Sequence, residues 1–352
     1  MYGRRLIRGR GAAAAARPAG LVCSAIAALV CAVAFGQRVP FAEWLEALRA
    51  EAAASGISAT TLDSALAGLE PLERVIERDR NQPEFTLDFR TYLTRVASAS
   101  RIEEGQRMLV EYRTLLEDVG RRYGMPPELL TAVWGVESNF GRTQGDFSVV
   151  QAAATLAYDG RRGAMFRREL LNALRILDQG HVEVGQMKGS WAGAMGQLQF
   201  MPSTFIDYAR DGDGDGRKDI WGNPADALES AASFMASQWR PGLRWGREVR
   251  LPDRFEIGLA GLDRREPLAE WQALGVRLPD GSDLPSANIT ASLVLPEDGA
   301  EPAFLVYENY RALMRWNRSH FFALAVGHLA DRIAGGPALR FIDADAEDGL
   351  AR

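Results

Sequence analysis

One glutamate, Glu137, stands near the end of an otherwise apolar stretch, "AVWGVES". Val133 and Trp134 precede it by four and three residues, so in a helix the carboxylate points to the same side as these apolar side chains. Removal from water disfavours the charged form of a carboxyl group and raises its pKa, which suits a general acid that works near neutral pH. Two structural alternatives stay open for Glu137: an ion pair with an arginine such as Arg142, or a solvated place at a helix end.

A second stretch, "GSWAGAMGQLQFMPSTF", combines glycines with amide and aromatic side chains. Glycines let a ligand or another segment approach the backbone closely. The amides of Gln197 and Gln199 can bond hydroxyl and acetamido groups, and the rings of Trp191 and Phe200 offer flat apolar faces. This combination is typical of a sugar-binding site. A turn that merely packs two helices would explain the glycines equally well, but not the amides.

The stretch "DGDGDGRKDIWG", residues 211–222, matches the first nine positions of a calcium-binding loop. Its alternating aspartates supply the closely spaced oxygen atoms that a hard cation needs. The twelfth position is Gly222 and not glutamate, so a bidentate carboxylate would have to come from the helix that follows. A solvated turn without an ion is the alternative. The predicted ligands, with a backbone carbonyl from the arginine, are Asp211, Asp213, Asp215, Arg217, Asp219 and Asp226.

Other kinds of chemistry lack the residues that they need. The chain has no G-x-S-x-G, no H-E-x-x-H and no phosphate-binding glycine loop, which leaves the serine-hydrolase, zinc-protease and nucleotide-binding classes without support. The three histidines, His181, His320 and His328, lack metal-ligand spacing, and we interpret them as structural. Both cysteines, Cys23 and Cys31, lie in the first 36 residues, so the remainder has no thiol chemistry. No cofactor for catalysis is expected.

The first 36 residues differ from the rest of the chain. Five arginines and no acidic residue accompany the apolar run "LVCSAIAALVCAVAF". This combination predicts a signal peptide over residues 1–36 that is cleaved after Ala34, and hence an exported protein. An uncleaved anchor and a lipid-modified cysteine are the alternatives, although valines before both cysteines argue against the second. Without these arginines, 36 basic residues stand against 46 acidic ones, and no nucleic-acid partner is expected.

The remaining chain reads mainly as helices. Ser58, Thr86 and Ser100 are predicted N-caps, and Ser100 with Glu103 has capping-box spacing ahead of a long helix to Tyr123. Short runs such as "REVRLP", "FEIGLA" and "ITASLVLP" are typical of strands. We therefore predict a mainly α (α+β) protein. Its parts are an N-terminal helical domain at 38–123, a core at 124–244, a small β-rich insertion at 245–306, closing helices at 307–335 and a tail at 336–352.

The motifs "GVESNFGR", "GAMGQLQFMPSTF", "DGDGDGRKDIW" and "RWNRSHFFALAVGHLADRI" occur in this order, and together they resemble the lytic murein transglycosylase B family. The resemblance runs from about Phe41 to Ile333. It implies a periplasmic enzyme with a lysozyme-like core and a structural calcium ion in the aspartate loop. The implied substrate is the glycan strand of peptidoglycan, cut between N-acetylmuramic acid and N-acetylglucosamine with formation of a 1,6-anhydro ring.

The resemblance also implies roles for single residues. Glu137 matches the family's one catalytic acid and base, and the sequence offers only Asp146 and Asp159 as candidates for a second carboxylate. The family often has tyrosine where this chain has Phe234, Trp316 and Phe322. These rings can still stack on a sugar, but they lack the hydroxyl group with which a tyrosine would form a hydrogen bond. For Arg161 and Arg162, a solvated position at the start of a helix is the alternative interpretation. The implied substrate-binding residues are Arg161, Arg162, Ser190, Gln199, Phe200, Trp316, Asn317 and Phe322.

Two further functions stay open at this point. A hydrolytic muramidase would use water and leave a reducing end, and a catalytically silent wall-binding protein would keep the fold alone. The presence of Glu137 favours an enzyme, because a silent descendant would be free to lose it. Proteins of cell-wall synthesis or division are candidate partners besides the glycan strands, and the sequence gives no indication of an oligomeric state.

Overall fold

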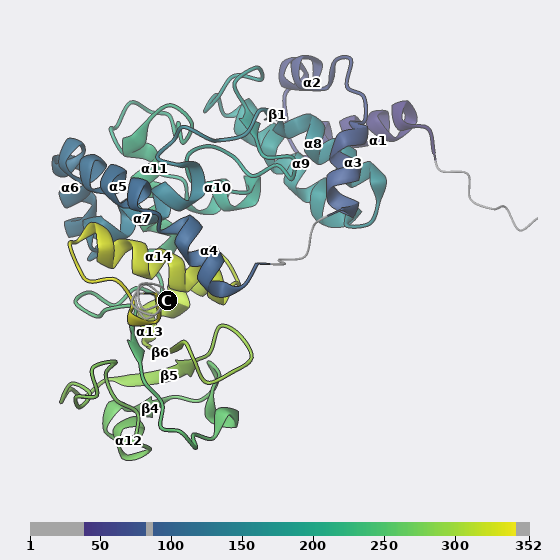
Figure 1. The fold of residues 1–352 in the computed structure, drawn as a ribbon. Coiled ribbons are helices and arrows are strands. Elements are labelled where there is room, and N and C mark those ends of the chain that lie inside the picture. The colour runs from purple at the N-terminus through teal and green to yellow at the C-terminus, as the bar shows by residue number, and fades with distance from the viewer. Residues whose placement is uncertain (1–38, 82–86, 343–352) are drawn as a thin grey trace, which may run out of the picture. The chain divides into compact units, whose positions relative to one another are not determined.

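A computed structural model describes residues 39–81 and 87–342 of the chain. Within these residues the chain forms fourteen α-helices and six short strands, which confirms the predicted mainly α fold with a small β part (Figure 1). The predicted signal segment, residues 1–36, lies outside the described residues, as do both cysteines. None of the helices in the described ranges has the length and apolar character that a membrane span requires.

The front part of the chain forms six helices, but not all of them begin where the sequence predicts. Ser58 caps its helix as predicted, because its hydroxyl accepts a backbone N–H bond. Thr86 lies outside the described residues, and Asp88 caps the helix that follows it. Ser98 provides the next cap in place of Ser100. The six helices are α1 (Phe41–Ala54), α2 (Ala59–Leu66), α3 (Glu73–Arg80), α4 (Phe89–Val96), α5 (Ala99–Glu111) and α6 (Arg113–Tyr123).

Helix α7 (Pro127–Ser138) lies at the centre of the helical core. Pro126 and Pro127 start it as predicted. The N–H groups of the first turn have no acceptor within the helix, so the N–H that proline lacks is not missed there. Helices α5 and α6, together with α11 (Pro224–Ala236) and α14 (His320–Ile333), pack against it. This packing explains why the seven consecutive residues from Leu129 to Gly135 are all buried.

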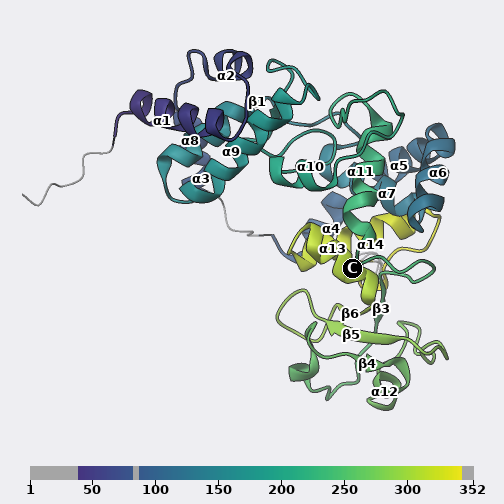
Figure 2. The same ribbon diagram turned by 180° about the vertical axis from the view of Figure 1, so that it is seen from behind.

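A second helical group contains α8 (Val149–Asp159) and α9 (Gly163–Asp178), which pack against each other. Helix α3 contacts α8, α2 contacts α9, and both views show α1, α2 and α3 beside this pair (Figures 1 and 2). The short helix α10 (Pro202–Tyr208) also packs on α9. The glycine- and amide-rich stretch leads from β2 (Lys188–Gly189), which pairs with β1 (Phe147–Ser148), into α10.

The predicted β-rich range contains a four-stranded antiparallel sheet. Its strands are β3 (Gly246–Val249), β4 (Glu266–Pro267), β5 (Thr290–Val294) and β6 (Ala303–Val306), in the order β3-β6-β5-β4. Side chains of β6 alternate between two cores: Phe304 and Val306 join the helical core, whereas Ala303 and Leu305 join a second core under the sheet. Because both faces of this strand are buried, the strand reads as an unbroken apolar run.

One predicted strand is wrong. The stretch "FEIGLA" forms a short 3₁₀ turn at Ile257–Leu259. Phe255 and Leu259 pack against the second core from this stretch, whereas Ile257 is 49% exposed. The same range also contains helix α12 (Leu268–Ala273), which carries the fully buried Trp271. After the sheet, helix α13 (Glu308–Trp316) returns the chain to the helical core and leads to α14.

Candidate active site

Glu137 lies in the last turn of α7, where the backbone takes an unusual course. The next residues, Asn139, Phe140 and Gly141, have φ values of 51°, 59° and 81°, which end the helix abruptly. Left-handed backbone is rare for a residue such as phenylalanine. It is held here because the Ser138 hydroxyl accepts the Gly141 amide at 2.8 Å. This turn therefore fixes the end of α7 directly after Glu137.

The Phe140 ring locks this turn onto the helix. It stands edge-on to the Trp134 ring, with 5.7 Å between ring centroids. It also lies over Gly135, where a Cβ atom would come within 2.7 Å of the ring carbons. A glycine is therefore needed at 135 for Phe140 to fold back. The sequence "WGVESNF" thus encodes both the helix and the turn that positions its glutamate.

Burial dominates the electrostatics of Glu137. Desolvation raises the pKa of its carboxyl group from 4.5 to about 7, and the hydrogen bond from Trp316 acts in the opposite direction. That bond runs from Trp316 Nε1 to Glu137 Oε1 at 2.7 Å. Arg142, which the sequence offered as a partner, instead forms a salt bridge with Glu104 of α5. The prediction of a desolvated carboxyl group on an apolar helix face is therefore supported, and an ion pair with Arg142 is not.

Tyr92 of α4 is a neighbour of Glu137 that sequence reasoning missed. Burial raises the pKa of its phenol first, and the charge of Glu137 raises it further. The Tyr92 ring also contacts the Phe321 ring, with 5.6 Å between centroids. In the sequence, Tyr92 falls between the buried Phe89 and Leu93 and looks like an ordinary core aromatic. Only the packing of α4 against α14 brings it near the carboxyl group.

Aromatic rings surround the Trp316 side of Glu137. The Trp316 ring centroid lies 5.4 Å from that of Phe200 and 5.0 Å from that of Phe234, the second pair edge-on. Phe200 is only 3% exposed, so its ring builds the wall more than it offers a stacking face. Phe322, near the start of α14, is 5% exposed and belongs to the helical core. Trp316 is half-buried, and Asn317, which follows it at the end of α13, is exposed.

The glycine- and amide-rich stretch forms a compact turn beside this site. Isolated bridges pair Met195 with Gly189 and with Phe200. The Gln199 amide donates to the carbonyl oxygens of Gln144 and Gly196, at 3.0 and 2.9 Å, and thereby ties the stretch to the loop that follows Glu137.

Two other polar side chains of this stretch also bond inside the protein. The Ser190 hydroxyl accepts the Ala194 amide at 3.0 Å. Gln197 is 4% exposed and accepts the Trp134 indole N–H at 2.8 Å. The sequence-based idea that Gln197 faces a sugar is therefore wrong, because its amide is spent within the core.

Arg161 and Arg162 lie at the start of α9. Both guanidinium groups bind the carboxylate of Asp79 in α3, which is 3% exposed. The side chains of the two arginines are still 51% and 38% exposed, so each keeps a face towards solvent. The arginines hold the pKa of the Asp79 carboxyl below its usual range, chiefly through the Arg161 hydrogen bond. Within the described residues, neither arginine forms a hydrogen bond or a ring contact with Glu137.

The two candidates for a second carboxylate gain no support. Asp159 forms a salt bridge with Arg80 at 2.8 Å, and Asp146 is exposed. Neither contributes to the shifted pKa of Glu137, which burial raises and the Trp316 hydrogen bond lowers. Within the described part of the chain, neither candidate therefore joins Glu137 as a second carboxylate.

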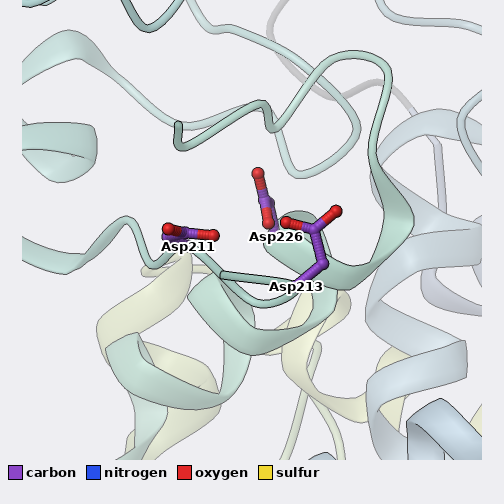
Figure 3. Close-up of side chains that lie close together, drawn as sticks. All are labelled: Asp211, Asp213 and Asp226. Atoms are coloured by element: carbon purple, nitrogen blue, oxygen red, sulfur yellow. The ribbon is translucent and has the colours of Figure 1, made fainter. Parts of the chain in front are cut away.

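The aspartate loop brings three of the predicted calcium ligands together. Oxygen atoms of Asp211, Asp213 and Asp226 lie within 4.8 Å of one another, and Figure 3 shows the three carboxylates around one small space. Asp226 is fully buried, and burial first, then the neighbouring aspartates, raises the pKa of its carboxyl group to about 6 although two backbone amides oppose this. A cation with oxygen ligands fits this donor set.

The other predicted calcium ligands do not join this cluster. The Asp215 carboxylate accepts the Arg217 amide at 2.8 Å. The Asp219 carboxylate accepts the amides of Trp221 and Gly222. Of the six predicted ligands, the structure thus brings together the carboxylates of Asp211, Asp213 and Asp226, which also accept backbone amides of the loop, and leaves those of Asp215 and Asp219 outside the cluster.

A helical core with one desolvated carboxyl group, walled by aromatic rings and joined to an amide-rich turn, matches the lysozyme-like core that the sequence predicts. The transglycosylase SLT domain model matches residues 40–331, and the chain belongs to this family of lytic transglycosylases. The predicted family, fold class and class of enzyme are confirmed.

The chain is similar to several characterised proteins. It is 30% identical over 258 residues to membrane-bound lytic murein transglycosylase B of Escherichia coli K12, across 69% of this chain and 66% of that relative, just under two thirds. A structure of SltB3 from Pseudomonas aeruginosa in complex with NAG-anhNAM-pentapeptide is 47% identical, with a TM-score of 0.82 over 86% of this chain and 80% of that one. E. coli Slt35 in complex with calcium is 27% identical, with a TM-score of 0.70 over 84% and 93%.

Proposed function

We propose that this chain cleaves the β-1,4 bond between N-acetylmuramic acid and N-acetylglucosamine in peptidoglycan and forms 1,6-anhydro-N-acetylmuramic acid. The observation that carries the proposal is the single carboxyl group of Glu137, with a pKa raised to about 7 by burial. A glycosidase that relies on two carboxylates needs the second one close by. One carboxyl group that titrates near neutral pH can serve as acid and then as base.

Glu137 would act twice in this reaction. In its protonated form it gives a proton to the glycosidic oxygen, while the N-acetyl carbonyl of the muramic acid stabilises the anomeric carbon. The resulting carboxylate then takes the proton from the C6 hydroxyl of the same sugar, and the C6 oxygen bonds to the anomeric carbon. Glu137 ends protonated again and no water is consumed. The anhydro sugar in the SltB3 complex is the kind of product that this sequence of steps forms.

The remaining site residues have proposed roles around this carboxyl group. Trp316 and Asn317, at the end of α13, would face the sugar next to Glu137, with Phe200 and Phe322 as the apolar wall behind. Ser190 and Gln199 would shape the amide-rich side, chiefly through their backbone and loop contacts. The solvent faces of Arg161 and Arg162 would meet carboxylates of the lactyl group or the peptide stem. Asp79 fixes the two arginines for that role.

Product analysis tests the proposed reaction. Purified sacculi are digested with the protein, and the released fragments are weighed by mass spectrometry; a Glu137→Gln digest serves as the blank. We expect anhydro ends from the wild type alone. Reducing ends, heavier by one water, would replace the proposal with a hydrolytic muramidase. Sacculi that stay intact under all conditions would favour a wall-binding protein without activity.

We also propose that the protein works in the periplasm, exported by the segment at residues 1–36. The support is the arginine-flanked apolar run in that segment and the similarity to the membrane-bound lytic murein transglycosylase B of E. coli. Glycan strands of peptidoglycan are its proposed partner. The parts at 38–123, 124–244, 245–306 and 307–335 remain our proposed division of the chain.

A structural calcium ion is proposed for the aspartate loop. The carboxylates of Asp211, Asp213 and Asp226 would hold it, with the Arg217 carbonyl, Asp215 and Asp219 as further candidate ligands. The ion would fix the loop against the start of α11, and it has no part in the chemical steps. The solved Slt35 complex with calcium supports a calcium ion in this family.

Removal of calcium is expected to lower the melting temperature. An ion that binds only the folded state stabilises it by mass action, so a chelator should lower the midpoint and added calcium should restore it. Asp213→Ala should abolish this response. The control is Asp253→Ala, which removes an exposed aspartate elsewhere and should leave the response intact. An unchanged midpoint with and without chelator in the wild type would refute the occupied loop.

A further inference from the structure

The hydrogen bond between Trp316 and Glu137 has a directional property that matters for an acid catalyst. The indole N–H can donate a hydrogen bond, but the ring offers no acceptor. Trp316 Nε1 points at Glu137 Oε1 from 2.7 Å. If Oε1 carried the proton, the O–H would have to point away from the indole N–H, and a hydroxyl oxygen is a weaker acceptor than the carbonyl oxygen of the acid. The hydrogen bond therefore favours the protonated form of Glu137 in which Oε1 is the carbonyl oxygen and the proton is on Oε2.

We propose that Trp316 is a positioning residue that keeps the Glu137 proton on Oε2 and so aims the acid at the glycosidic oxygen. This inference rests on the proposed function, because it assigns a role in the same reaction. A carboxyl group free to rotate would present the proton on either oxygen, and only one of these arrangements can reach the substrate. By disfavouring the second arrangement, Trp316 prepares the acid before the substrate binds.

The structure holds the indole firmly enough for this role. Its ring is wedged between Phe200 and Phe234, at centroid distances of 5.4 and 5.0 Å. The neighbouring Arg315 anchors the end of α13, because one of its nitrogens donates to the Phe234 carbonyl at 2.9 Å and to the Ser237 hydroxyl at 2.7 Å. The guanidinium group also lies over the Phe234 ring, 4.6 Å from its centroid. Trp316 therefore cannot follow Glu137 if the carboxyl group turns.

The same bond serves the second half of the reaction. After the first proton transfer, Glu137 is a carboxylate inside a desolvated site, and the N–H donor then stabilises its negative charge. Trp316 thereby lowers the pKa that burial has raised. The indole N–H of Trp316 thus orients the protonated carboxyl group of Glu137 and lowers the basicity of its carboxylate.

Trp316→Phe tests the proposal because it keeps a ring and removes the N–H. We expect kcat to fall about tenfold with little change in KM, as for a group that acts in the transition state. Loss of the donor should also raise the pKa of Glu137, so the basic limb of the pH–rate profile should move up by about one pH unit, a tenfold change in acidity. Trp316→Tyr restores a donor, so its basic limb should return towards that of the wild type. Its hydroxyl can also accept, so kcat should recover only in part.

Trp239→Phe is the matched control. Trp239 is a buried tryptophan whose indole donates to the Gly124 carbonyl at 2.9 Å, so the variant loses the same kind of hydrogen bond at another place. It should lose some stability and keep the position of the basic limb. If Trp316→Phe keeps the wild-type limb and kcat, as the control does, the positioning role is wrong. A wild type without lytic activity would instead refute the proposed function itself.

A spectroscopic measurement covers the case in which Trp316→Phe does not fold. In ¹⁵N-labelled protein, one indole N–H resonance should shift as Glu137 titrates near pH 7, and the same resonance should stay constant in Glu137→Gln. If no indole resonance follows that titration, the hydrogen bond is absent in solution and the proposal falls.

Discussion

Glu137→Gln is expected to abolish cleavage of peptidoglycan and, at the same time, to stabilise the fold above pH 7. Glutamine can accept the Trp316 hydrogen bond and fills nearly the same space, so the surrounding structure should persist. It can neither give nor take the proton in the proposed reaction. General acid and base catalysis contributes about 10²–10⁴-fold in each role, so the rate should fall by at least about a thousandfold.

The gain in stability follows from the raised pKa of Glu137. An unfolded chain releases this proton near pH 4.5, whereas the folded chain keeps it to about 7. Between these values the folded state binds more protons, so the stability of the wild type falls as the pH rises, and above 7 the full penalty is present. For a shift of this size the penalty is at most about 3 kcal/mol. Glutamine does not ionise and avoids it.

Urea unfolding of both proteins at pH 4, 6 and 8 measures this difference. The stability gap should be close to zero at pH 4 and should grow to about 2–3 kcal/mol at pH 8. Glu117→Gln, which removes an exposed carboxylate from α6, controls for the loss of one negative charge and should keep full activity. A gap that is the same at all three pH values would mean that Glu137 is not desolvated in solution.

Local patterns in the sequence were enough to predict where Glu137 lies on its helix. The spacing of Val133 and Trp134 placed the carboxyl group on an apolar face, and the two prolines at 126 and 127 marked the start of α7. The predicted cap at Ser58 was right for the same reason, since capping is a contact between residues close in sequence. Where two candidates for a cap stood close together, as at Ser98 and Ser100, the pattern could not decide between them.

Contacts between distant segments were beyond such patterns. Trp316 is 179 residues away from Glu137, and nothing local to either residue indicates their hydrogen bond. The salt bridges of Arg161 and Arg162 with Asp79 depend in the same way on the packing of α3 against α8. Gln197 looked free to bind a ligand because the sequence does not show its hydrogen bond with Trp134, which lies in a distant segment. The residue types indicated which chemistry was possible, and the packing decided which polar groups already had hydrogen-bond or ion-pair partners inside the protein.

The loop after Glu137 and the amide-rich stretch are pressed together at Gly145. Its φ of 90° favours glycine, and a Cβ atom there would lie 2.2 Å from the Gly189 carbonyl oxygen and 2.7 Å from the Ser190 amide nitrogen. Both of these atoms belong to the backbone next to the β1–β2 pair and have little room to move. The two segments can meet in this way only while residue 145 has no side chain.

Gly145→Ala is therefore expected to destabilise the fold strongly and to reduce activity. Overpacking against fixed atoms costs about 1–3 kcal/mol or more, and a left-handed backbone adds about 1 kcal/mol for alanine. Gly180→Ala separates the two causes, because Gly180 has a φ of 75° but nothing within 4 Å of the added Cβ, so it should cost only about 1 kcal/mol.

Urea unfolding measures both variants. The larger loss should come with slower cleavage, because pushing residue 145 away from Gly189 also pulls on the bond from Gln199 to the Gln144 carbonyl. Equal losses in the two variants would show that the segments yield to each other, and that their close contact does not hold the site together.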